Sequence, residues 1–189
     1  MVGWEQALDT FVSRAGEAVC WMLVGSAATR VQGALVDPAD VDILVHPETS
    51  DSDLGAITAA FVPYAATHTV SQEPDHFLST PDQPLAATPD GTWLFGRWMI
   101  AGCKLEVARI RVDLDATTII ETLGTGVWDT RRTVPWRGHH VPVVPLEVQL
   151  ATMLSRGLDQ RVSAVRAHLD ADGGDEVLLA QAMNDRGIR

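Results

Sequence analysis

Residues 23–45 read LVGSAATRVQGALVDPADVDILV, and the order of features in this stretch decides the fold. The apolar run 20–24 predicts a buried strand, which stops at Gly25-Ser26. Ser26 is a suitable N-cap and Gly33 a suitable C-terminal stop, so a short helix is expected between them. The aliphatic, β-branched stretch 40–45 predicts a second strand.

The second strand carries two carboxylates on one face. Residues i and i+2 of a strand point to the same side, so Asp40 and Asp42 project together while Val41, Ile43 and Val45 face the core. Two neighbouring carboxylates repel each other and are stabilised by a bound cation. Oxygen ligands suit hard divalent cations, so Mg²⁺ is the expected occupant and Mn²⁺ the alternative.

A later hairpin supplies further charged candidates. Residues 92–100 and 104–112 predict two strands around the turn Ala101-Gly102. If the strand 104–112 lies next to the strand 40–45, Glu106 provides a third carboxylate. Lys104 lies on the same face as Glu106, where it either contacts a phosphate or pairs with Glu106.

The Gly25-Ser26 turn is a candidate phosphate-binding element. A glycine before a helix N-terminus lets phosphate oxygens approach backbone N–H groups, and the helix dipole favours their charge. Arg30, one turn after Ser26, either reaches the nucleotide or is an exposed helix arginine. A metal on Asp40 and Asp42 would bridge the phosphates of a triphosphate while an acceptor hydroxyl attacks in line.

The stretch 23–45 resembles the DNA polymerase β-type nucleotidyltransferase superfamily, especially its small, minimal or toxin-type members. IAGCKLEVARI, residues 100–110, resembles the strand that carries the third acid in such proteins, and residues 145–162 are similar to their C-terminal helical part. The resemblance implies an α/β (α+β) fold: a small mixed β-sheet flanked by helices, with C-terminal helices. It also implies Mg²⁺ and a nucleoside triphosphate as ligands.

By residue, the resemblance implies that Asp40, Asp42 and Glu106 are catalytic and bind the metal, and that Gly25 and Ser26 bind phosphate. The sequence departs from the family pattern at two places. The third acid is a glutamate where aspartate is commoner, and Leu158-Asp159 replaces a Lys-Asp pair found in many relatives. A basic substrate contact is therefore expected to be missing at the second place.

Two domains are expected, a nucleotidyltransferase-like domain over 1–144 and a C-terminal helical segment over 145–189 packed on it. Between residues 67 and 90 prolines favour an irregular excursion with at most one short strand, around 76–78. A last strand is expected over 141–144. Helical spacing of apolar residues predicts helices over 4–18, 52–64, 145–156, 159–169 and 175–183.

Composition limits the function classes. Of the 189 residues 46% are hydrophobic, enough for a packed core, and the formal net charge of −11 excludes a broadly basic surface for general DNA binding. Lys104 is the single lysine. No apolar stretch is long enough to span a membrane, and residues 1–19 do not resemble a signal peptide. Cys20 and Cys103 lack metal-ligand spacing and are expected to be buried thiols of a cytoplasmic protein.

The leading functional prediction is a Mg²⁺-dependent nucleotidyltransferase that moves a nucleoside monophosphate from a triphosphate to an acceptor hydroxyl. A small molecule, an RNA such as a tRNA end, and a protein side chain all remain open as acceptors. The alternative is a catalytically inactive nucleotide- or partner-binding module, such as one half of a toxin–antitoxin pair. A glycosyltransferase is disfavoured because only 39 residues precede Asp40, and an aspartyl phosphatase because Ile43-Leu44 replaces the expected turn.

Overall fold

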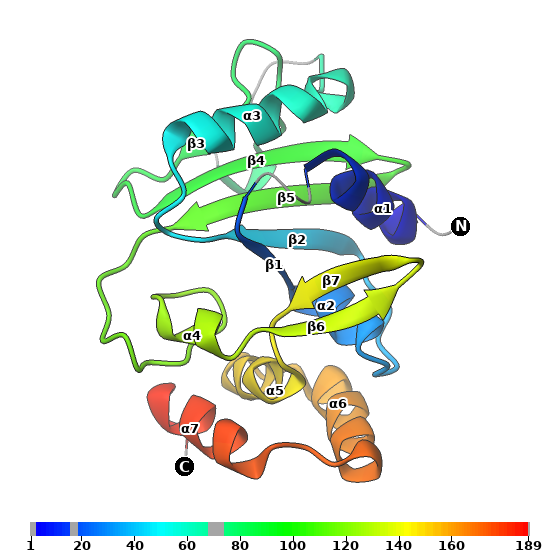
Figure 1. The fold of residues 1–189 in the computed structure, drawn as a ribbon, viewed down its shortest axis with the longest axis vertical. Coiled ribbons are helices and arrows are strands. Elements are labelled where there is room, and N and C mark those ends of the chain that lie inside the picture. The colour runs from blue at the N-terminus through cyan, green and yellow to red at the C-terminus, as the bar shows by residue number, and fades with distance from the viewer. Residues whose placement is uncertain (1–2, 16–18, 68–73, 189) are drawn as a thin grey trace. The chain divides into compact units, whose positions relative to one another are not determined.

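The computed structural model describes residues 3–15, 19–67 and 74–188. The chain divides into two compact units: the first comprises residues 1–21 and 39–111, and the second residues 22–38 and 112–189. The predicted boundary at residue 144 does not coincide with this division. Residues 22–38 and 112–144 group with the C-terminal helices, because strand pairing and helix packing join them. Each unit is described separately below (Figure 1).

Within its described residues, the first unit contains four complete strands. In chain order they are β2 (Asp40–Val45), β3 (Ala86–Ala87), β4 (Trp93–Ile100) and β5 (Cys103–Ile110). They pair side by side as β3-β4-β5-β2, and only the pairing of β2 with β5 is parallel. The predicted neighbourhood of the strands 40–45 and 104–112 is confirmed. The strand expected around residues 76–78 is wrong, because a short 3₁₀ helix, η2 (Pro74–His76), lies there.

The turn between β4 and β5 fixes the register of this hairpin. Ile100 pairs with Cys103, so only Ala101 and Gly102 form the loop. Both have positive φ, 52° and 77°. Two-residue hairpin loops with positive φ at both positions match the right-handed twist of the flanking strands. Glycine adopts this conformation without steric cost, whereas Ala101 adopts it only because the hairpin closes around it.

Two helices cover one face of these strands. α1 (Gly3–Ala15) buries an apolar stripe, and α3 (Asp51–Phe61) begins at Ser50, whose hydroxyl accepts a hydrogen bond from the Asp53 amide. The 3₁₀ helix η1 (Val62–Tyr64) follows α3 at a proline, which cannot continue the helical hydrogen bonds. The ring of Phe61 lies 5.3 Å from that of Trp98 on β4, and α1 packs against β5. The opposite face carries charged side chains and also the buried ring of Phe95, which packs against Phe77.

The strand β1 (Trp21–Val24) belongs to the second unit except for its first residue, Trp21. The same unit contains β6 (Arg132–Trp136) and β7 (His139–Val143). β7 pairs in parallel with β1, through Leu23 and Val143, and antiparallel with β6. The sequence predicted β7 but not β6. Residues of β6 are half-buried or exposed and include Pro135, which is typical of an edge strand and leaves a weak sequence pattern.

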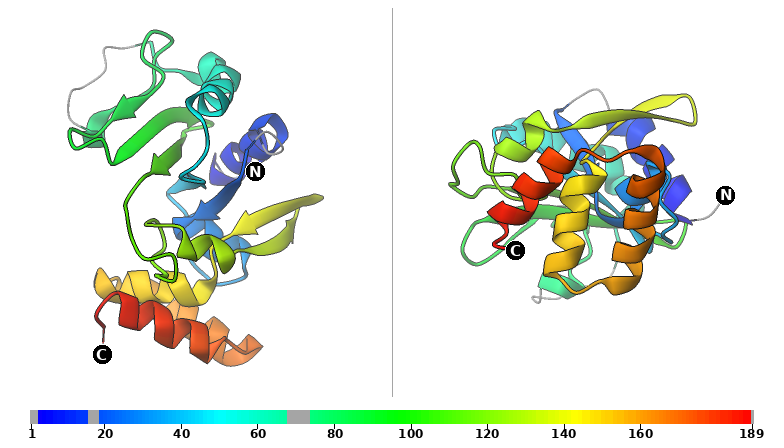
Figure 2. Two further views of the ribbon diagram at one scale, coloured as in Figure 1. Left: turned by 60° about the vertical axis from the view of Figure 1, so that its left-hand side comes forward. Right: turned by 90° about the horizontal axis from the view of Figure 1, so that it is seen from below.

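Five helices complete the second unit: α2 (Gly25–Val31), α4 (Gly126–Asp129), α5 (Leu146–Ser155), α6 (Asp159–Asp172) and α7 (Glu176–Asp185). α5 contacts α2, α6 and α7, and Figure 2 shows the three C-terminal helices side by side. Their shared apolar cluster includes Leu146, Leu150, Met153 and Val165, together with Ala34 from the segment after α2.

Both units combine strands with helices, so the predicted mixed α/β class is confirmed. None of the helices in the described part of the chain is long and apolar enough to cross a membrane.

Phe11 is the central aromatic residue of the first unit. Its ring centroid lies 4.9 Å from that of Trp21 and 6.0 Å from that of Phe61, and its side chain is fully buried. We expect Phe11→Ala to lower the free energy of unfolding by about 3–5 kcal/mol, because it removes apolar contacts and leaves a cavity. Urea unfolding measures the change, with the exposed Ser13→Ala on the same helix as control. A loss no larger than that of the control would contradict this packing role.

Candidate functional site

Five charged side chains share one face of three adjacent strands in the first unit. The strand register places Asp42 of β2 opposite Glu106 of β5, and Glu106 opposite Arg97 of β4. One step along the strands, Asp40 lies opposite Lys104. Residues directly opposite one another on paired strands project on the same side. We call this surface the charged face; it consists of Asp40, Asp42, Arg97, Lys104 and Glu106.

The other face of the same strands is apolar, which explains why the charged face is ordered. Val41, Ile43, Leu105 and Val107 are almost completely buried. Because side chains alternate along a strand, burial of these residues forces their neighbours Asp40, Asp42, Lys104 and Glu106 outward. The predicted alternation within residues 40–45 is therefore confirmed.

Two ion pairs of unequal burial cross the charged face. The Arg97 Nε–H group donates to Oε2 of Glu106, and both side chains are 13% exposed. The Lys104 ammonium lies 3.4 Å from the Asp40 carboxylate, and these side chains are 38% and 31% exposed. An ion pair this open to solvent contributes little, about 0–1 kcal/mol. Lys104 was expected either to contact a phosphate or to pair with Glu106. In the structure it pairs with Asp40 instead of Glu106.

The ion pairs of the charged face limit which of its carboxylates could bind a metal ion. Within the described residues, no group of three or more His, Cys, Asp or Glu side chains is placed to hold a metal ion. Glu106 is engaged by Arg97 in a largely buried pair, whereas Asp40 and Asp42 are half-buried on the same strand. Two carboxylates that are partly open to solvent on one strand face suit a hard divalent cation. The donor set therefore fits Mg²⁺ through two residues, with the third carboxylate held back.

The carboxylates of Asp40 and Asp42 affect the pKa of the nearby Cys103 thiol. Burial raises the pKa of its thiol, and the nearby charges of Asp40 and Asp42 raise this pKa further, whereas Lys104 lowers it. The thiol donates a weak hydrogen bond to the carbonyl oxygen of Ala39 at 3.5 Å. Cys103 is buried as expected, but Cys20 is exposed, because β1 begins only at the next residue.

In the second unit, the turn at Gly25 is held by two buried polar side chains. Gly25 has φ +67°, and its N–H group donates to Oε1 of Glu121 at 3.0 Å. The Gln149 amide donates to the carbonyl oxygen of Gly25 at 2.6 Å and accepts a hydrogen bond from the Thr29 hydroxyl at 2.8 Å. Glu121 is 5% exposed and Gln149 fully buried, so the turn is anchored from inside the unit.

This anchoring corrects two expectations about the phosphate-binding element. Ser26 is not the N-cap: α2 begins at Gly25 after Val24, and Glu121 satisfies the Gly25 N–H group in place of a local cap. The same hydrogen bond means that this N–H group is not free for a phosphate. Ser26 is buried and its hydroxyl has no hydrogen-bond partner in the described part of the chain, whereas Arg30 is exposed at the end of α2.

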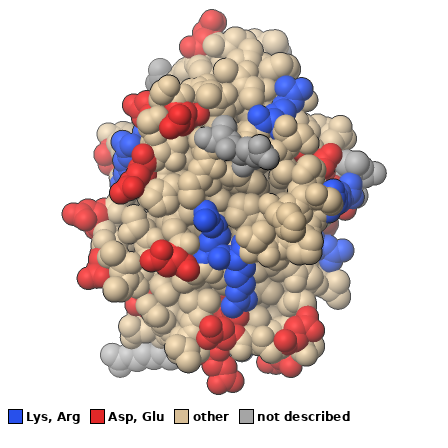
Figure 3. Space-filling model, in the orientation of Figure 1, with Lys and Arg blue, Asp and Glu red and all other residues tan. Residues whose placement is uncertain are grey.

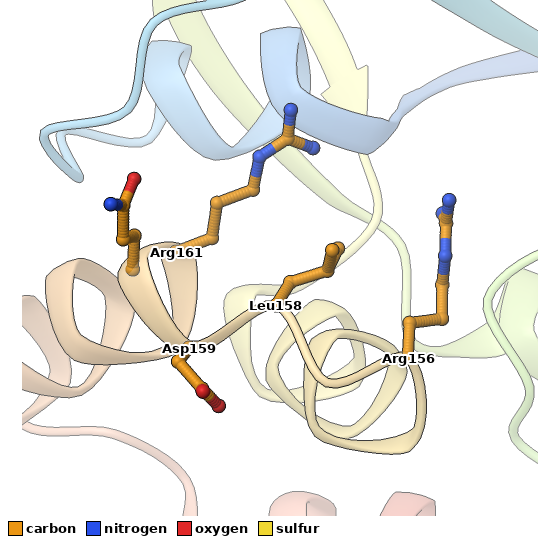
Figure 4. A pocket seen from close by; sticks show the side chains of 5 residues that line it. Arg156, Leu158, Asp159 and Arg161 are labelled. Atoms are coloured by element: carbon orange, nitrogen blue, oxygen red, sulfur yellow. The ribbon is translucent and has the colours of Figure 1, made fainter.

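A cavity of about 340 Å³ lies at the turn from α5 to α6. Figure 4 shows Arg156 and Arg161 rising on the same side of this turn, with Leu158 between them and Asp159 directed away. Within the described residues neither guanidinium makes a hydrogen bond or an ion pair. Two arginines therefore flank Leu158-Asp159, where the sequence departs from the family pattern.

Arg186 adds a further positive charge in this unit. Its guanidinium donates to the Thr152 hydroxyl at 2.7 Å. Burial lowers its pKa, the Glu121 carboxylate opposes this, and Arg156 lowers the pKa further. An arginine nevertheless stays protonated at physiological pH.

On the face drawn in Figure 3, basic side chains form small groups among acidic ones.

No protein-family model and no curated protein matches the chain. Among solved structures, the chain is similar to the crystal structure of a proposed nucleotidyltransferase from Thermotoga maritima. The two share 22% sequence identity with a TM-score of 0.54, over 88% of this chain and 92% of the other. At this identity the likeness shows the fold, which is nucleotidyltransferase-like.

Glu121, like Arg97 and Gln149, is a residue that sequence reasoning missed, and its anchoring role is testable. We expect Glu121→Ala to lower the free energy of unfolding by about 1–3 kcal/mol, because the buried Gly25 N–H group loses its acceptor. Glu121→Gln retains an acceptor oxygen and is expected to lose less. Urea unfolding, with the exposed Asp170→Ala as control, measures both changes. Wild-type stability of the alanine variant would show that the turn does not depend on this contact.

The effect of Asp40 and Asp42 on Cys103 gives a second test. The combined substitution Asp40→Asn and Asp42→Asn removes two negative charges and is expected to lower the pKa of the thiol. More thiolate then forms at a given pH, so alkylation of Cys103 becomes faster and its pH profile moves to lower pH. Peptide mapping after iodoacetamide treatment measures the rate, with Cys20 as internal reference. An unchanged profile would contradict the proximity of these charges.

Proposed function

We propose that the protein is a Mg²⁺-dependent nucleotidyltransferase that transfers a nucleoside monophosphate from a triphosphate to an acceptor hydroxyl. The observation that carries the proposal is the pair Asp40 and Asp42 on the charged face of a nucleotidyltransferase-like fold. Nucleotidyl transfer needs carboxylates that hold a divalent cation against phosphate oxygens, and these two residues have the required type and spacing.

The acidic residues and the lysine of the charged face have proposed roles in the transfer. Asp40 and Asp42 hold the cation, which when bound supplies positive charge that offsets the charge on the attacking and leaving oxygens. Glu106 either completes the metal site or accepts the proton of the acceptor hydroxyl. Lys104 has a flexible and exposed ammonium, so it can leave Asp40 and contact a phosphate once the carboxylate binds metal.

For the phosphates, the second unit offers several donors. Gly25 and Ser26 are proposed from the resemblance, but the Gly25 N–H group already donates to Glu121. The guanidinium of Arg30 is exposed and makes no hydrogen bond or ion pair within the described residues. We therefore propose that Arg30 contributes more to phosphate binding than the turn does.

A second candidate is a catalytically inactive nucleotide- or partner-binding module. The two ion pairs favour it, since Lys104 and Arg97 already neutralise Asp40 and Glu106 without any metal. Such a protein would bind a nucleotide or partner without transferring anything.

The decisive experiment compares wild-type protein with the variant Asp40→Asn, Asp42→Asn. The four triphosphates, labelled at the α-phosphate, are incubated with Mg²⁺ or Mn²⁺ and with RNA, cell protein or small-molecule extract. We expect label transfer by the wild type and background transfer by the variant, because the variant lacks both metal-binding carboxylates. Its fold should persist, since the substitutions remove mutual repulsion, and circular dichroism checks this.

The matched control is Glu48→Gln with Asp82→Asn, which removes two exposed acids outside the charged face. This control should transfer label like the wild type. Equal transfer by the Asp40, Asp42 variant would refute the catalytic assignment. Triphosphate binding without transfer by the wild type would favour the inactive module.

A further inference from the structure

We infer that Arg97 sets the metal affinity of the charged face by competing with a bound cation for Glu106. The inference rests on the proposed function only in taking Asp40 and Asp42 as the metal-binding carboxylates. It concerns a residue of β4 that neither the motif at residues 23–45 nor the resemblance singles out.

The structure holds Arg97 firmly in place beside Glu106. Their side chains are opposite one another across β4 and β5, and both are largely buried. The guanidinium lies 4.5 Å from the ring centre of Phe95, a cation–π contact that fixes its position. The Arg97 backbone is tied to buried Ser79, whose hydroxyl accepts from the Arg97 N–H group at 2.9 Å.

Charge explains why this arrangement weakens metal binding. A guanidinium remains protonated at all ordinary pH values, so it neutralises Glu106 permanently. A cation on Asp42 gains Glu106 as a ligand only if Arg97 releases it. If Arg97 does not release Glu106, the cation is repelled by a fixed positive charge nearby. Arg97 lowers the affinity for metal in either case.

Lys104 provides an internal comparison on the same face. Its pair with Asp40 is much more exposed than the pair of Arg97 with Glu106. Water screens an exposed pair strongly, and the lysine side chain can swing away at little cost. A cation that approaches Asp40 therefore displaces Lys104 easily, whereas displacing Arg97 breaks a buried contact. The removal of Arg97 should accordingly matter more than the removal of Lys104.

The test is a titration with Mn²⁺ in the absence of nucleotide, followed through the electron paramagnetic resonance of free Mn²⁺. We expect Arg97→Gln to bind Mn²⁺ about tenfold more tightly than the wild type or better, which is about 1.4 kcal/mol. Arg97→Lys keeps the charge and should stay within a few-fold of the wild type, and Lys104→Gln should tighten binding less than Arg97→Gln does. Adding Asp40→Asn and Asp42→Asn to Arg97→Gln should abolish the tight binding.

The variant Arg97→Gln, Glu106→Gln tests whether the effect passes through Glu106. It removes both charges of the pair while its two amides can still hydrogen-bond, so it should return to wild-type affinity. Affinity in Arg97→Gln that equals or falls below the wild type would overturn the inference. So would a double variant that binds as tightly as Arg97→Gln, since Arg97 would then act independently of Glu106.

If Arg97→Gln fails to fold, the wild type itself decides the question. The Arg97 Nε–H resonance, assigned by its loss in Arg97→Lys, should shift as Mg²⁺ is added and should stay fixed in the Asp40, Asp42 variant. A resonance that does not move with added Mg²⁺ would overturn the inference. The titrations need no transfer reaction, so loss of nucleotidyl transfer alone would refute the proposed function and leave this inference standing.

Discussion

The parallel pairing of β2 with β5 is the constraint on which the charged face depends. It places Asp42 opposite Glu106 and Asp40 opposite Lys104, and the antiparallel hairpin then brings Arg97 to Glu106. The register is held by buried residues on the other side, such as Val41 and Leu105. A slip of one residue would bury carboxylates and expose aliphatic side chains, which makes the arrangement of charges a direct result of packing.

The elements with strong apolar periodicity could be predicted from the sequence. The strand β2 has the expected bounds, and the helices α5, α6 and α7 begin within a residue of their expected positions. Arg97 could also have been found, because a two-residue turn at Ala101-Gly102 requires residue 97 to face residue 106. Glu121 could not, since it lies in an irregular segment and meets Gly25 across 96 residues of sequence.

The extent of the contact between the C-terminal helices and the earlier part of the chain was beyond the reach of local patterns. The helical pattern after Pro145 predicted a segment packed on the preceding domain; in the structure α5 contacts α2, and Gln149 of α5 holds the Gly25 turn. Such long-range contacts decide which parts of a chain form one unit, and no periodicity within a helix reveals them. The net charge of −11 is similarly uninformative about the charged face, where Lys104 pairs with Asp40 and Arg97 pairs with Glu106.

The turn Ala101-Gly102 limits which side chains its own two positions accept. Both residues have positive φ, which glycine adopts readily and a β-branched side chain does not. Because Ile100 pairs with Cys103, the same two residues also set the pairing that brings Arg97 to Glu106. A substitution in this exposed loop that changes the turn therefore acts on the charged face through the strand register.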